Sequence, residues 1–483
     1  MTVRRTKIVA TLGPASSSPE VLEQLILAGM DVARLNFSHG SPAEHKARAV
    51  LVREIAAKQG RFVALLGDLQ GPKIRIAKFT DQRIELKTGD SFRFSISHPR
   101  TAGTQEVVCI DYPDLLTDCK VGDELLLDDG RVEMRVDAVT ADELQCTVLI
   151  GGPLSDHKGI NRRGGGLTAP ALTDKDRADI ILATEMDLDY LAVSFPRDAA
   201  DMHEARRLRD AAGGHAWLIA KIERAEAVAD DAVLDGLIRA SDGVMVARGD
   251  LGVEIGDAEL VVIQKKIIAA ARRLNKVVIT ATQMMESMIH SPMPTRAEVS
   301  DVANASLDYT DAVMLSAESA AGEYPVEAVQ AMARVCLGAE KHRTSQNSSQ
   351  RPDKTFERCD ESIALAAMYT ANHFPGIKAI ICLTESGYTP LIMSRVRSSM
   401  PIFAFSPHRP TQARAAMFRG VQTVPFDPAA LPAEKVSQAA VDELLKRGVV
   451  QPGDWVILTK GDSYHTVGGT NTMKILHVGD SMV

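Results

Sequence analysis

Short apolar runs in this chain end in polar residues, and many of these polar residues are spaced two positions apart. On a β-strand, residues two apart point to the same face, so each group would present its side chains together. Carboxylate, ammonium, guanidinium and hydroxyl groups assembled in this way could bind a metal ion and an anionic substrate. The groups, in chain order, are Arg34/Asn36/Ser38, Lys221/Glu223, Arg248/Asp250, Thr280/Thr282 and Ser316/Glu318.

Two carboxylates, Glu223 and Asp250, end consecutive runs of this series. If the runs are adjacent strands, about 4.8 Å separates them, and both carboxylates can reach one cation. Mg²⁺ suits this arrangement, because it takes one or two carboxylates and completes its coordination with water and phosphate oxygens. The alternative is a structural salt-bridge network with Lys221 and Arg248, although four charged groups at adjacent strand ends are costly unless something is bound.

Lys221 and Arg34 are the positive groups best placed to meet a phosphate. Lys221 shares a face with Glu223 and is suited to neutralise a phosphoryl group during transfer, where catalysis is mostly positioning and charge stabilisation. Its alternative role is that of a simple partner for Glu223. Arg34 carries the planar fork that binds phosphate or carboxylate through two hydrogen bonds, and its alternative is an inter-strand ion pair.

Oxygen ligands and hydroxyls complete the series. Asn36, Ser38 and Asp68 lie on neighbouring runs and could hold a second, monovalent cation. For His39, a nucleotide contact or a packed loop histidine is favoured over a phosphohistidine. The side chains at the ends of the last two runs are Thr282, Ser316 and Glu318. They could contact substrate or relay a proton, or they could be ordinary strand-end residues.

The elements that must position these residues are the apolar runs themselves, which alternate with helical patterns. Eight such strands with polar groups at their C-terminal ends predict a (β/α)8 barrel, whose active site lies at that face. The predicted strands are Lys7–Gly13, Val32–Ser38, Val63–Asp68, Tyr190–Phe195, Leu218–Glu223, Val244–Asp250, Val277–Thr282 and Ala312–Glu318.

The barrel rhythm stops after Asp68 and resumes at Thr173, a good helix cap. Between them lie short alternating runs with a hairpin signal at Asp129-Gly130, and a plausible hinge at residues 164–166. We therefore predict a β-rich lid inserted in the barrel and, after a polar segment at 341–358, a smaller α/β domain. The expected bounds are 1–71 and 169–343 for the barrel, 72–168 for the lid, and 344–483 for the last domain.

Composition excludes several classes of protein. The 483 residues carry a formal net charge of −8 and contain no basic block, so we expect no nucleic-acid partner. No run approaches the ~18 apolar residues of a membrane span, and Gly13-Pro14 interrupts the first apolar run too early for a signal peptide. Six cysteines without Cys-x-x-Cys spacing predict reduced thiols in a cytosolic protein.

Nucleotide-binding signatures are also informative. The sequence contains neither a P-loop motif nor a Gly-x-Gly-x-x-Gly motif after a strand. A nucleotide would therefore not be held by a P-loop, and a dinucleotide-binding fold is disfavoured.

In the last domain, the segment from Thr384 to Thr389 lies between a predicted strand and a predicted helix. Hydroxyls and backbone N–H groups at a helix start can form a phosphate nest, so a regulatory anion site is one interpretation and an ordinary capped loop is the other.

Taken in order, the motifs resemble those of pyruvate kinase over essentially the whole chain. Several long motifs in the correct order are far more specific than a single short pattern. They are Lys7–Pro14 (KIVATLGP), Arg34–Gly40 (RLNFSHG), Gly67–Arg75 (GDLQGPKIR), Lys221–Glu226 (KIERAE), Met245–Glu254 (MVARGDLGVE), Thr280–Met288 (TATQMMESM), Thr295–Asn304 (TRAEVSDVAN) and Leu315–Gly322 (LSAESAAG).

The resemblance implies a barrel, an inserted lid and a C-terminal effector domain, and transfer of phosphate from phosphoenolpyruvate to ADP, giving pyruvate and ATP. It implies that Glu223 and Asp250 bind Mg²⁺, that Lys221 stabilises the phosphoryl group, and that a second Mg²⁺ arrives with the nucleotide. It further implies that Arg34 binds the substrate phosphate and that the substrate carboxylate is bound by Gly249, Asp250 and Thr282. ADP would be bound by Asn36, His39, Arg75 and Lys158. The enolate would be protonated with the help of Ser316 and Glu318.

One departure from the family pattern concerns Lys73, which stands where many members that need K⁺ carry a glutamate. We expect its ammonium group to lie near Asn36, Ser38 and Asp68 and to replace the monovalent cation, so that K⁺ is not required. The effector loop resembles the sugar-phosphate site of family members, with AMP and hexose or pentose monophosphates as candidates; its residues are Thr384, Ser386 and Thr389.

The prediction is thus a cytoplasmic, Mg²⁺-dependent and allosterically regulated pyruvate kinase, homotetrameric by analogy. One rival is a Mg²⁺-dependent aldolase or lyase acting on a pyruvate enolate, but it leaves Lys221 and the lid unexplained. The other is a non-catalytic sensor of a phosphorylated metabolite, for which the polar residues of the barrel would be dispensable.

Overall fold

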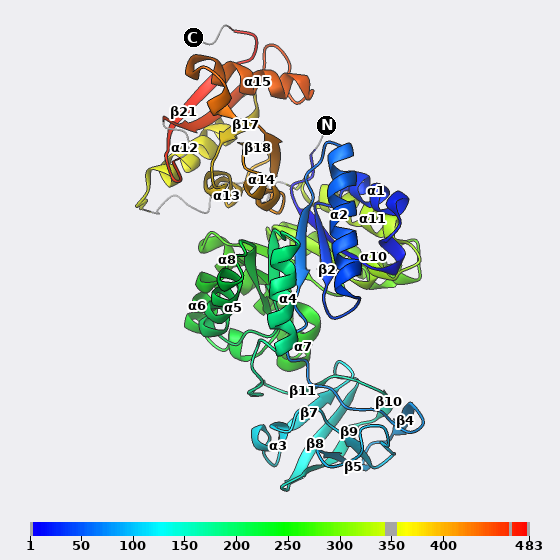
Figure 1. Ribbon diagram of the computed structural model, residues 1–483. Coiled ribbons are helices and arrows are strands. Elements are labelled where there is room, and N and C mark those ends of the chain that lie inside the picture. Colours follow the sequence, from blue (N-terminus) through cyan, green and yellow to red (C-terminus); the bar gives the residue numbers. More distant parts are fainter. Residues whose placement is uncertain (1–2, 343–354, 463–465, 481–483) are drawn as a thin grey trace.

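The computed structural model describes residues 3–342, 355–462 and 466–480. Its parts lie in a row, with the barrel in the middle, the β-rich lid at one end and the C-terminal α/β part at the other (Figure 1). The predicted polar segment at 341–358 lies largely outside the described residues. No helix in the described part of the chain is both long enough and apolar enough to span a membrane.

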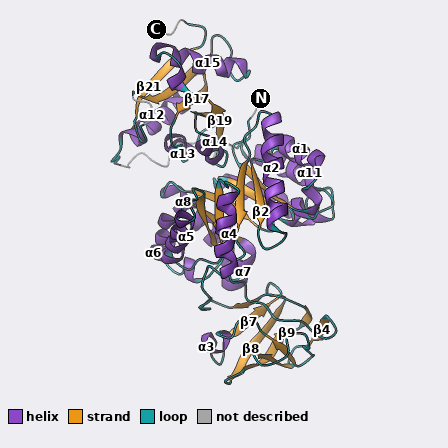
Figure 2. Ribbon diagram, in the orientation of Figure 1, coloured by secondary structure: helices purple, strands orange, loops and turns teal. Residues whose placement is uncertain are grey.

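A closed barrel of eight parallel strands forms the centre of the described structure, in the order β1-β16-β15-β14-β13-β12-β3-β2. Helices surround these strands (Figure 2). The predicted barrel and each predicted strand are therefore confirmed. The strands are β1 (Lys7–Leu12), β2 (Val32–Asn36), β3 (Ala64–Asp68), β12 (Tyr190–Val193), β13 (Trp217–Ile222), β14 (Gly243–Ala247), β15 (Val277–Ala281) and β16 (Ala312–Leu315).

Several strands end earlier than their apolar runs predicted. Arg248 and Asp250 lie in the first turn of helix α7 (Arg248–Ile255), and Ser316 precedes helix α10 (Ala317–Ala320), which contains Glu318. The prediction that each of these two pairs shares one face of a strand is wrong. The chain turns into a helix directly after the strand, and a spacing of two no longer means a shared face once the period changes from 2.0 to 3.6.

The surrounding helices begin where capping residues predict. Ser18 accepts a hydrogen bond from the N–H of Val21, and Thr173 accepts one from Asp176, which confirms the predicted helix start at Thr173. The principal helices are α1 (Pro19–Ala28), α2 (Pro42–Lys58), α4 (Asp174–Glu185), α5 (Ala199–Ala211), α6 (Asp231–Ala240), α8 (Asp257–Arg273), α9 (Arg296–Leu307) and α11 (Pro325–Ala339).

The lid is β-rich, as predicted, and packs around a core of its own that includes Phe92, Phe94 and Leu125. Its main sheet has the order β11-β7-β8-β9-β5-β6, and β10 pairs with β4. Positive φ angles at 128–130 make the predicted hairpin turn between β7 and β8. Its elements are β4 (Arg83–Leu86), β5 (Ser91–Ser95), β6 (Val107–Cys109), α3 (Leu115–Asp118), β7 (Glu124–Leu127), β8 (Val132–Val139), β9 (Glu143–Ile150), β10 (Gly152–Ser155) and β11 (Ile160–Arg162).

Consecutive glycines return the chain from the lid to the barrel. Gly164, Gly165 and Gly166 have φ angles of 78°, 77° and 91°, a left-handed conformation that glycine adopts without the penalty of a Cβ. A Cβ at Gly165 would lie 2.5 Å from an oxygen of Glu226. The backbone therefore requires glycine here, and the glycines occupy the position predicted for the hinge.

The C-terminal part is an α/β sheet in the order β19-β18-β17-β20-β21, with β21 antiparallel to β20. The sequence did not predict β19 or α14, because both are short and lack strong periodicity. The elements are α12 (Cys359–His373), β17 (Ile377–Leu383), α13 (Tyr388–Ser394), β18 (Ile402–Ser406), α14 (Arg409–Ala415), β19 (Val421–Pro425), α15 (Val436–Lys446), β20 (Trp455–Gly461) and β21 (Thr470–His477).

The C-terminal part packs against the N-terminal ends of the barrel strands. Inward-facing barrel residues such as Val9 and Ile279 belong to one apolar cluster with Met417 and Phe418 of the C-terminal part. At the same joint, the carboxylate of Asp311 pairs with the guanidinium of Arg395, and both side chains are 1% exposed. The joint therefore combines an apolar cluster with buried ion pairs, of which Arg419 with Glu340 is another.

Candidate active site

An ammonium group held by buried carboxylates lies at the C-terminal ends of the barrel strands. Nζ of Lys221 on β13 lies 2.9 Å from Oε1 of Glu223 and 3.4 Å from Oδ1 of Asp68 at the end of β3. It also donates a hydrogen bond of 2.8 Å to the hydroxyl of Ser194. The strands concerned, β13, β12 and β3, are neighbours in the barrel. The sequence predicted that Lys221 lies beside Glu223, and the sheet adds Asp68 and Ser194 as further partners.

The charge state of Lys221 follows from these contacts. Burial alone would lower the pKa of its ammonium group, but Asp68 and Glu223 outweigh burial and the pKa is raised. Lys221 therefore remains protonated at neutral pH. It is a fixed positive charge rather than a base.

Arg34 extends the same network to β2. Its Nε lies 2.6 Å from Oδ2 of Asp68, and its Nη1 donates to the hydroxyl of Thr11 at 2.9 Å. Burial would raise the pKa of Asp68, but Arg34 and Lys221 prevail and the pKa is lowered. The inter-strand ion pair considered for Arg34 thus exists, and the Asp68 carboxylate expected to hold a monovalent cation already binds two cationic side chains.

Glu223 is 1% exposed and lies beside a backbone in an unusual conformation. Its Oε2 accepts a hydrogen bond of 2.8 Å from the N–H of Phe195, whose φ is 56°. Burial raises the pKa of Glu223 to about 7 against the attraction of Lys221, and the negative charge of Asp250 adds to the rise. A buried carboxylate that feels the negative charge of a second carboxylate is a natural position for a cation.

Lys73 lies on Asp250 and not where the sequence placed it. Its Nζ is 2.9 Å from Oδ1 of Asp250 and 3.9 Å from Oδ1 of Asp129 in the lid hairpin. We expected this ammonium group near Asn36, Ser38 and Asp68, but the lysine whose ion pair reaches Asp68 is Lys221. Lys73 follows Gly71-Pro72, where the chain leaves the barrel for the lid, and this turn directs its side chain toward α7 and the hairpin.

The loop after β15 supplies Thr282, which has a left-handed backbone with φ of 67°. Its hydroxyl accepts the N–H of Gly249 at 2.8 Å and donates to the carbonyl of Ala281 at 2.7 Å. Arg248 does not pair with Glu223 or Asp250 and instead pairs with Asp301 on α9 at 2.6 Å. The alternative of a salt-bridge network of Glu223 and Asp250 with Lys221 and Arg248 is therefore present only in part, because Lys221 pairs with Glu223 whereas Arg248 pairs with Asp301. Thr282, like Phe195, has the left-handed backbone that functional sites often contain.

Family models identify the chain by its two main parts. Residues 3–329 match the model described as "Pyruvate kinase, barrel domain", and residues 361–476 match "Pyruvate kinase, alpha/beta domain". The chain belongs to the pyruvate kinase family. It is accordingly an enzyme, a phosphotransferase of that family, as its motifs predicted.

Curated relatives cover nearly the full chain. It is 57% identical over 476 residues to pyruvate kinase II of Salmonella typhimurium, with 99% of each chain covered. It is 54% identical over 459 residues to pyruvate kinase of Haemophilus influenzae, covering 95% of this chain and 96% of that one. Pyruvate kinase of Geobacillus stearothermophilus is 44% identical over 481 residues, which are 99% of this chain and 81% of the relative.

In this pyruvate kinase family member, Glu318 holds two backbone segments. Its carboxylate accepts the N–H of Ser316 at 2.7 Å and, more weakly, that of Met285 at 3.3 Å. Burial raises the pKa of Glu318 although these N–H groups oppose the rise. The contacts give Glu318 a positioning role, since it ties the end of β16 to the loop that carries Thr282.

The residues predicted to bind nucleotide lie on two different parts of this family member. Arg75 and Lys158 come together at the base of the lid, where Nη1 of Arg75 donates to the carbonyl of His157 and Lys158 pairs with Asp128 at 2.7 Å. His39 lies in the barrel loop after β2, where its carbonyl is 2.8 Å from a ring nitrogen of His45. Nearby, the Asn36 side chain accepts the N–H of Ser38.

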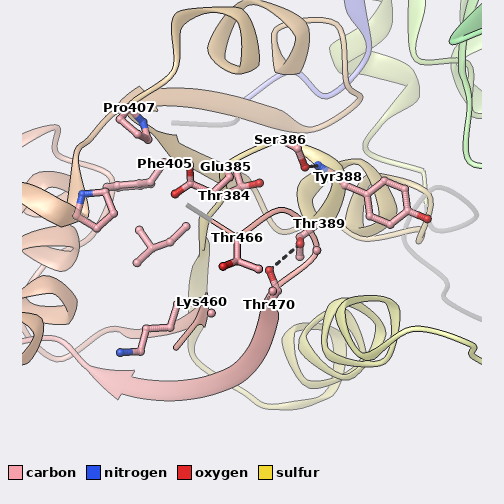
Figure 3. A pocket seen from close by; sticks show the side chains of 15 residues that line it. Thr384, Glu385, Ser386, Tyr388, Thr389, Phe405, Pro407, Lys460, Thr466 and Thr470 are labelled. Carbon is pink, nitrogen blue, oxygen red and sulfur yellow. Dashed lines mark hydrogen bonds between the residues drawn. The ribbon is translucent and has the colours of Figure 1, made fainter. Parts of the chain in front are cut away.

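The predicted effector loop lines a pocket of about 500 Å³, including space open to solvent, in the C-terminal part (Figure 3). Thr384 accepts the N–H of Gly387 at 2.9 Å, and the hydroxyls of Thr389 and Thr470 are 2.9 Å apart. The Ser386 hydroxyl accepts the N–H of Tyr388 at 3.4 Å. The loop is thus internally capped, and it also borders a pocket.

Three residues of these sites were missed by reasoning from sequence. Ser194 and Thr11 lie at or near the ends of predicted strands, so the criterion that selected Lys221 could have found them. Lys460, which lines the effector pocket, directly follows a predicted strand of the last domain. Neither Ser194 nor Thr11 belongs to a group of polar residues spaced two positions apart, which is the pattern that pointed to most of the predicted site residues.

Replacing Glu318 by alanine should destabilise the fold, because the N–H groups of Ser316 and Met285 lose their acceptor, each at a cost of about 1–3 kcal/mol. We expect a clear fall in melting temperature, measured by calorimetry. Ser316→Ala is the matched control, since it keeps both backbone bonds and should melt as the wild type does. Equal melting of Glu318→Ala and the wild type would contradict the positioning role.

Proposed function

We propose that this enzyme transfers the phosphoryl group of phosphoenolpyruvate to ADP and yields pyruvate and ATP, with Mg²⁺ as the metal. The observation that carries the proposal is the protonated Lys221 between Glu223 and Asp68, close to Arg34, at the face where barrel enzymes act. Relatives named pyruvate kinase, with up to 57% identity among those compared, support the same reaction.

The residues present suit a magnesium ion. Glu223 and Asp250 would contribute two carboxylates, and no larger group of His, Cys, Asp or Glu side chains within the described ranges is arranged to hold a metal. This matches Mg²⁺, which leaves several coordination positions to water and substrate oxygens. Burial and, in addition, the charge of Asp250 raise the pKa of Glu223, so the two carboxylates lie close enough to interact. When bound, the ion would polarise phosphoryl oxygens.

Different protein groups would contact the phosphate and the carboxylate of phosphoenolpyruvate. Arg34 would bind the substrate phosphate, and the Lys221 ammonium would neutralise the charge that spreads over the phosphoryl oxygens during transfer. The first N–H groups of α7, at Gly249 and Asp250, with the Thr282 hydroxyl, would hold the substrate carboxylate. A helix N-terminus favours an anion at this place.

ADP would bind between barrel and lid. Asn36 and His39 would contact it from the barrel loop, and Arg75 and Lys158 from the lid, with a second Mg²⁺ accompanying the nucleotide. After transfer, the enolate carbon needs a proton. The Ser316 hydroxyl would help to deliver this proton, while Glu318 would act by positioning the backbone segments that it binds.

We also propose that K⁺ is not required. Asp68 has Arg34 and Lys221 as partners, and Asp250 has Lys73, so fixed cations already face the carboxylates at this end of the barrel. The Asn36, Ser38 and Asp68 oxygens would then not hold a monovalent ion. A cytoplasmic homotetramer, with a phosphorylated effector in the C-terminal pocket, completes the proposal.

Replacing Lys221 by alanine should lower kcat by roughly a thousandfold or more, because the transferring group loses its main fixed positive charge. A coupled assay of ATP formed from phosphoenolpyruvate and ADP measures this, and circular dichroism checks the fold. Lys46→Ala, which removes an exposed lysine paired with Glu185, is the control and should keep full activity. Undiminished turnover of Lys221→Ala would defeat the assignment.

Removing K⁺ should leave most of the activity. The measurement compares turnover in K⁺ with turnover in a bulky organic cation at constant ionic strength, with Mg²⁺ held fixed. Fixed ammonium groups do not depend on the added salt, so we expect the two rates to agree within about twofold, a difference of ~0.4 kcal/mol. Loss of most of the turnover without K⁺ would refute this proposal.

Binding of a phosphorylated effector at the C-terminal pocket should shift the saturation curve for phosphoenolpyruvate. The assay adds AMP, a hexose monophosphate or a pentose monophosphate in turn. Ser386→Glu places a negative charge in the pocket and should abolish the shift while preserving basal turnover, whereas Gln451→Glu, exposed in the same part of the chain, should retain it. A shift that persists in Ser386→Glu would locate the effector elsewhere.

A further inference from the structure

Glu254 is a buried carboxylate that the proposed reaction does not use. It is 3% exposed and lies on α7, one turn beyond Asp250. Its Oε2 accepts the N–H of Ala225 at 2.8 Å, two residues after Glu223. Glu254 thus joins the two chain segments that carry the proposed metal ligands.

The same residue also reaches the lid. Its Oε1 lies 3.4 Å from the amide nitrogen of Asn161 on β11, and its backbone carbonyl accepts the N–H of Gly164 at 2.9 Å. Asn161 is itself buried, and Gly164 begins the glycine hinge. One residue therefore contacts the returning strand of the lid through its side chain and the hinge through its backbone.

Charged neighbours surround this contact on the barrel side. Arg224 pairs with Glu226 at 3.6 Å and donates to the carbonyl of Leu167, and Glu226 accepts the N–H of Gly166. Lys73 and Phe195 line the same small cavity as Glu254, which has a volume of about 330 Å³ including space open to solvent. Both chain crossings between barrel and lid, at 72–74 and at 160–169, meet there.

Keeping a carboxylate in this position has a cost. Burial raises the pKa of Glu254 to about 7, although the Ala225 N–H opposes the rise. A buried carboxylate is retained at low cost only where hydrogen bonds satisfy it, and here those bonds come from both sides of the hinge.

We propose that Glu254 is a positioning residue that sets the orientation of the lid relative to the loop of Glu223 and the helix of Asp250. The inference rests on the proposed function, because the lid carries Arg75 and Lys158, which would bind ADP. Loosening Glu254 would move these two residues and leave Arg34 and Lys221 in place. The defect should therefore fall on ADP and spare phosphoenolpyruvate.

The experiment compares Glu254→Ala, Glu254→Gln and Asn161→Ala, with Glu54→Gln on the exposed face of α2 as control. Glu254→Ala should raise KM for ADP about tenfold, the effect of losing roughly 1.4 kcal/mol of hydrogen bonding, with much smaller changes in KM for phosphoenolpyruvate. Glu254→Gln keeps an acceptor for the Ala225 N–H and should recover most of the loss. Asn161→Ala cuts only the lid contact and should reproduce part of the ADP defect.

Hydrogen exchange gives a readout that does not depend on turnover. The amides of residues 164–166 should exchange faster in Glu254→Ala and in Asn161→Ala than in the wild type and in Glu54→Gln. Should Glu254→Ala fail to fold, Asn161→Ala still decides the matter. Unchanged exchange at the hinge, or equal rises in KM for both substrates, would overturn the proposal, whereas absence of phosphoryl transfer in the wild type would instead defeat the proposed function.

Discussion

The active end of the barrel depends on one buried interaction, the ammonium group of Lys221 between the carboxylates of Asp68 and Glu223. A lone charge in this place would be expelled or neutralised, so each of the three groups makes the others tolerable. The interaction forms because the sheet order places β3, β12 and β13 side by side, although β3 is far from the other two strands in the chain. Strand order and charge pairing therefore support each other.

Much of this architecture could be predicted from the sequence because buried parallel strands are continuous apolar runs with definite ends. That reasoning placed Lys221 beside Glu223, but it assigned Asp68 to a monovalent-cation site and not to Lys221. It failed for Arg248, which is two residues from Asp250 but lies in a helix, where that spacing sends side chains in different directions. Sequence shows that a run ends, and tertiary packing decides whether the chain continues as strand or turns into helix.

Lys73 shows a second limit. The family resemblance suggested a place beside Asp68, yet the chain turns into the lid at that point and the side chain pairs with Asp250. Glu254 was quoted within a motif and given no role, because its partners, Ala225 and Asn161, come from distant segments. Contacts between an insertion and its host are set by three-dimensional packing, which periodicity does not report.

The apolar cluster that continues from the barrel interior into the C-terminal part has a consequence for dissecting this molecule. The lid encloses its own core and is joined by narrow crossings, so it is the part that could be deleted or exchanged between relatives. The α/β part is different, since it forms the floor of the barrel. A fragment ending near residue 342 would expose Val9 and Ile279 to water. It would aggregate through this apolar surface, which the α/β part covers in the intact chain.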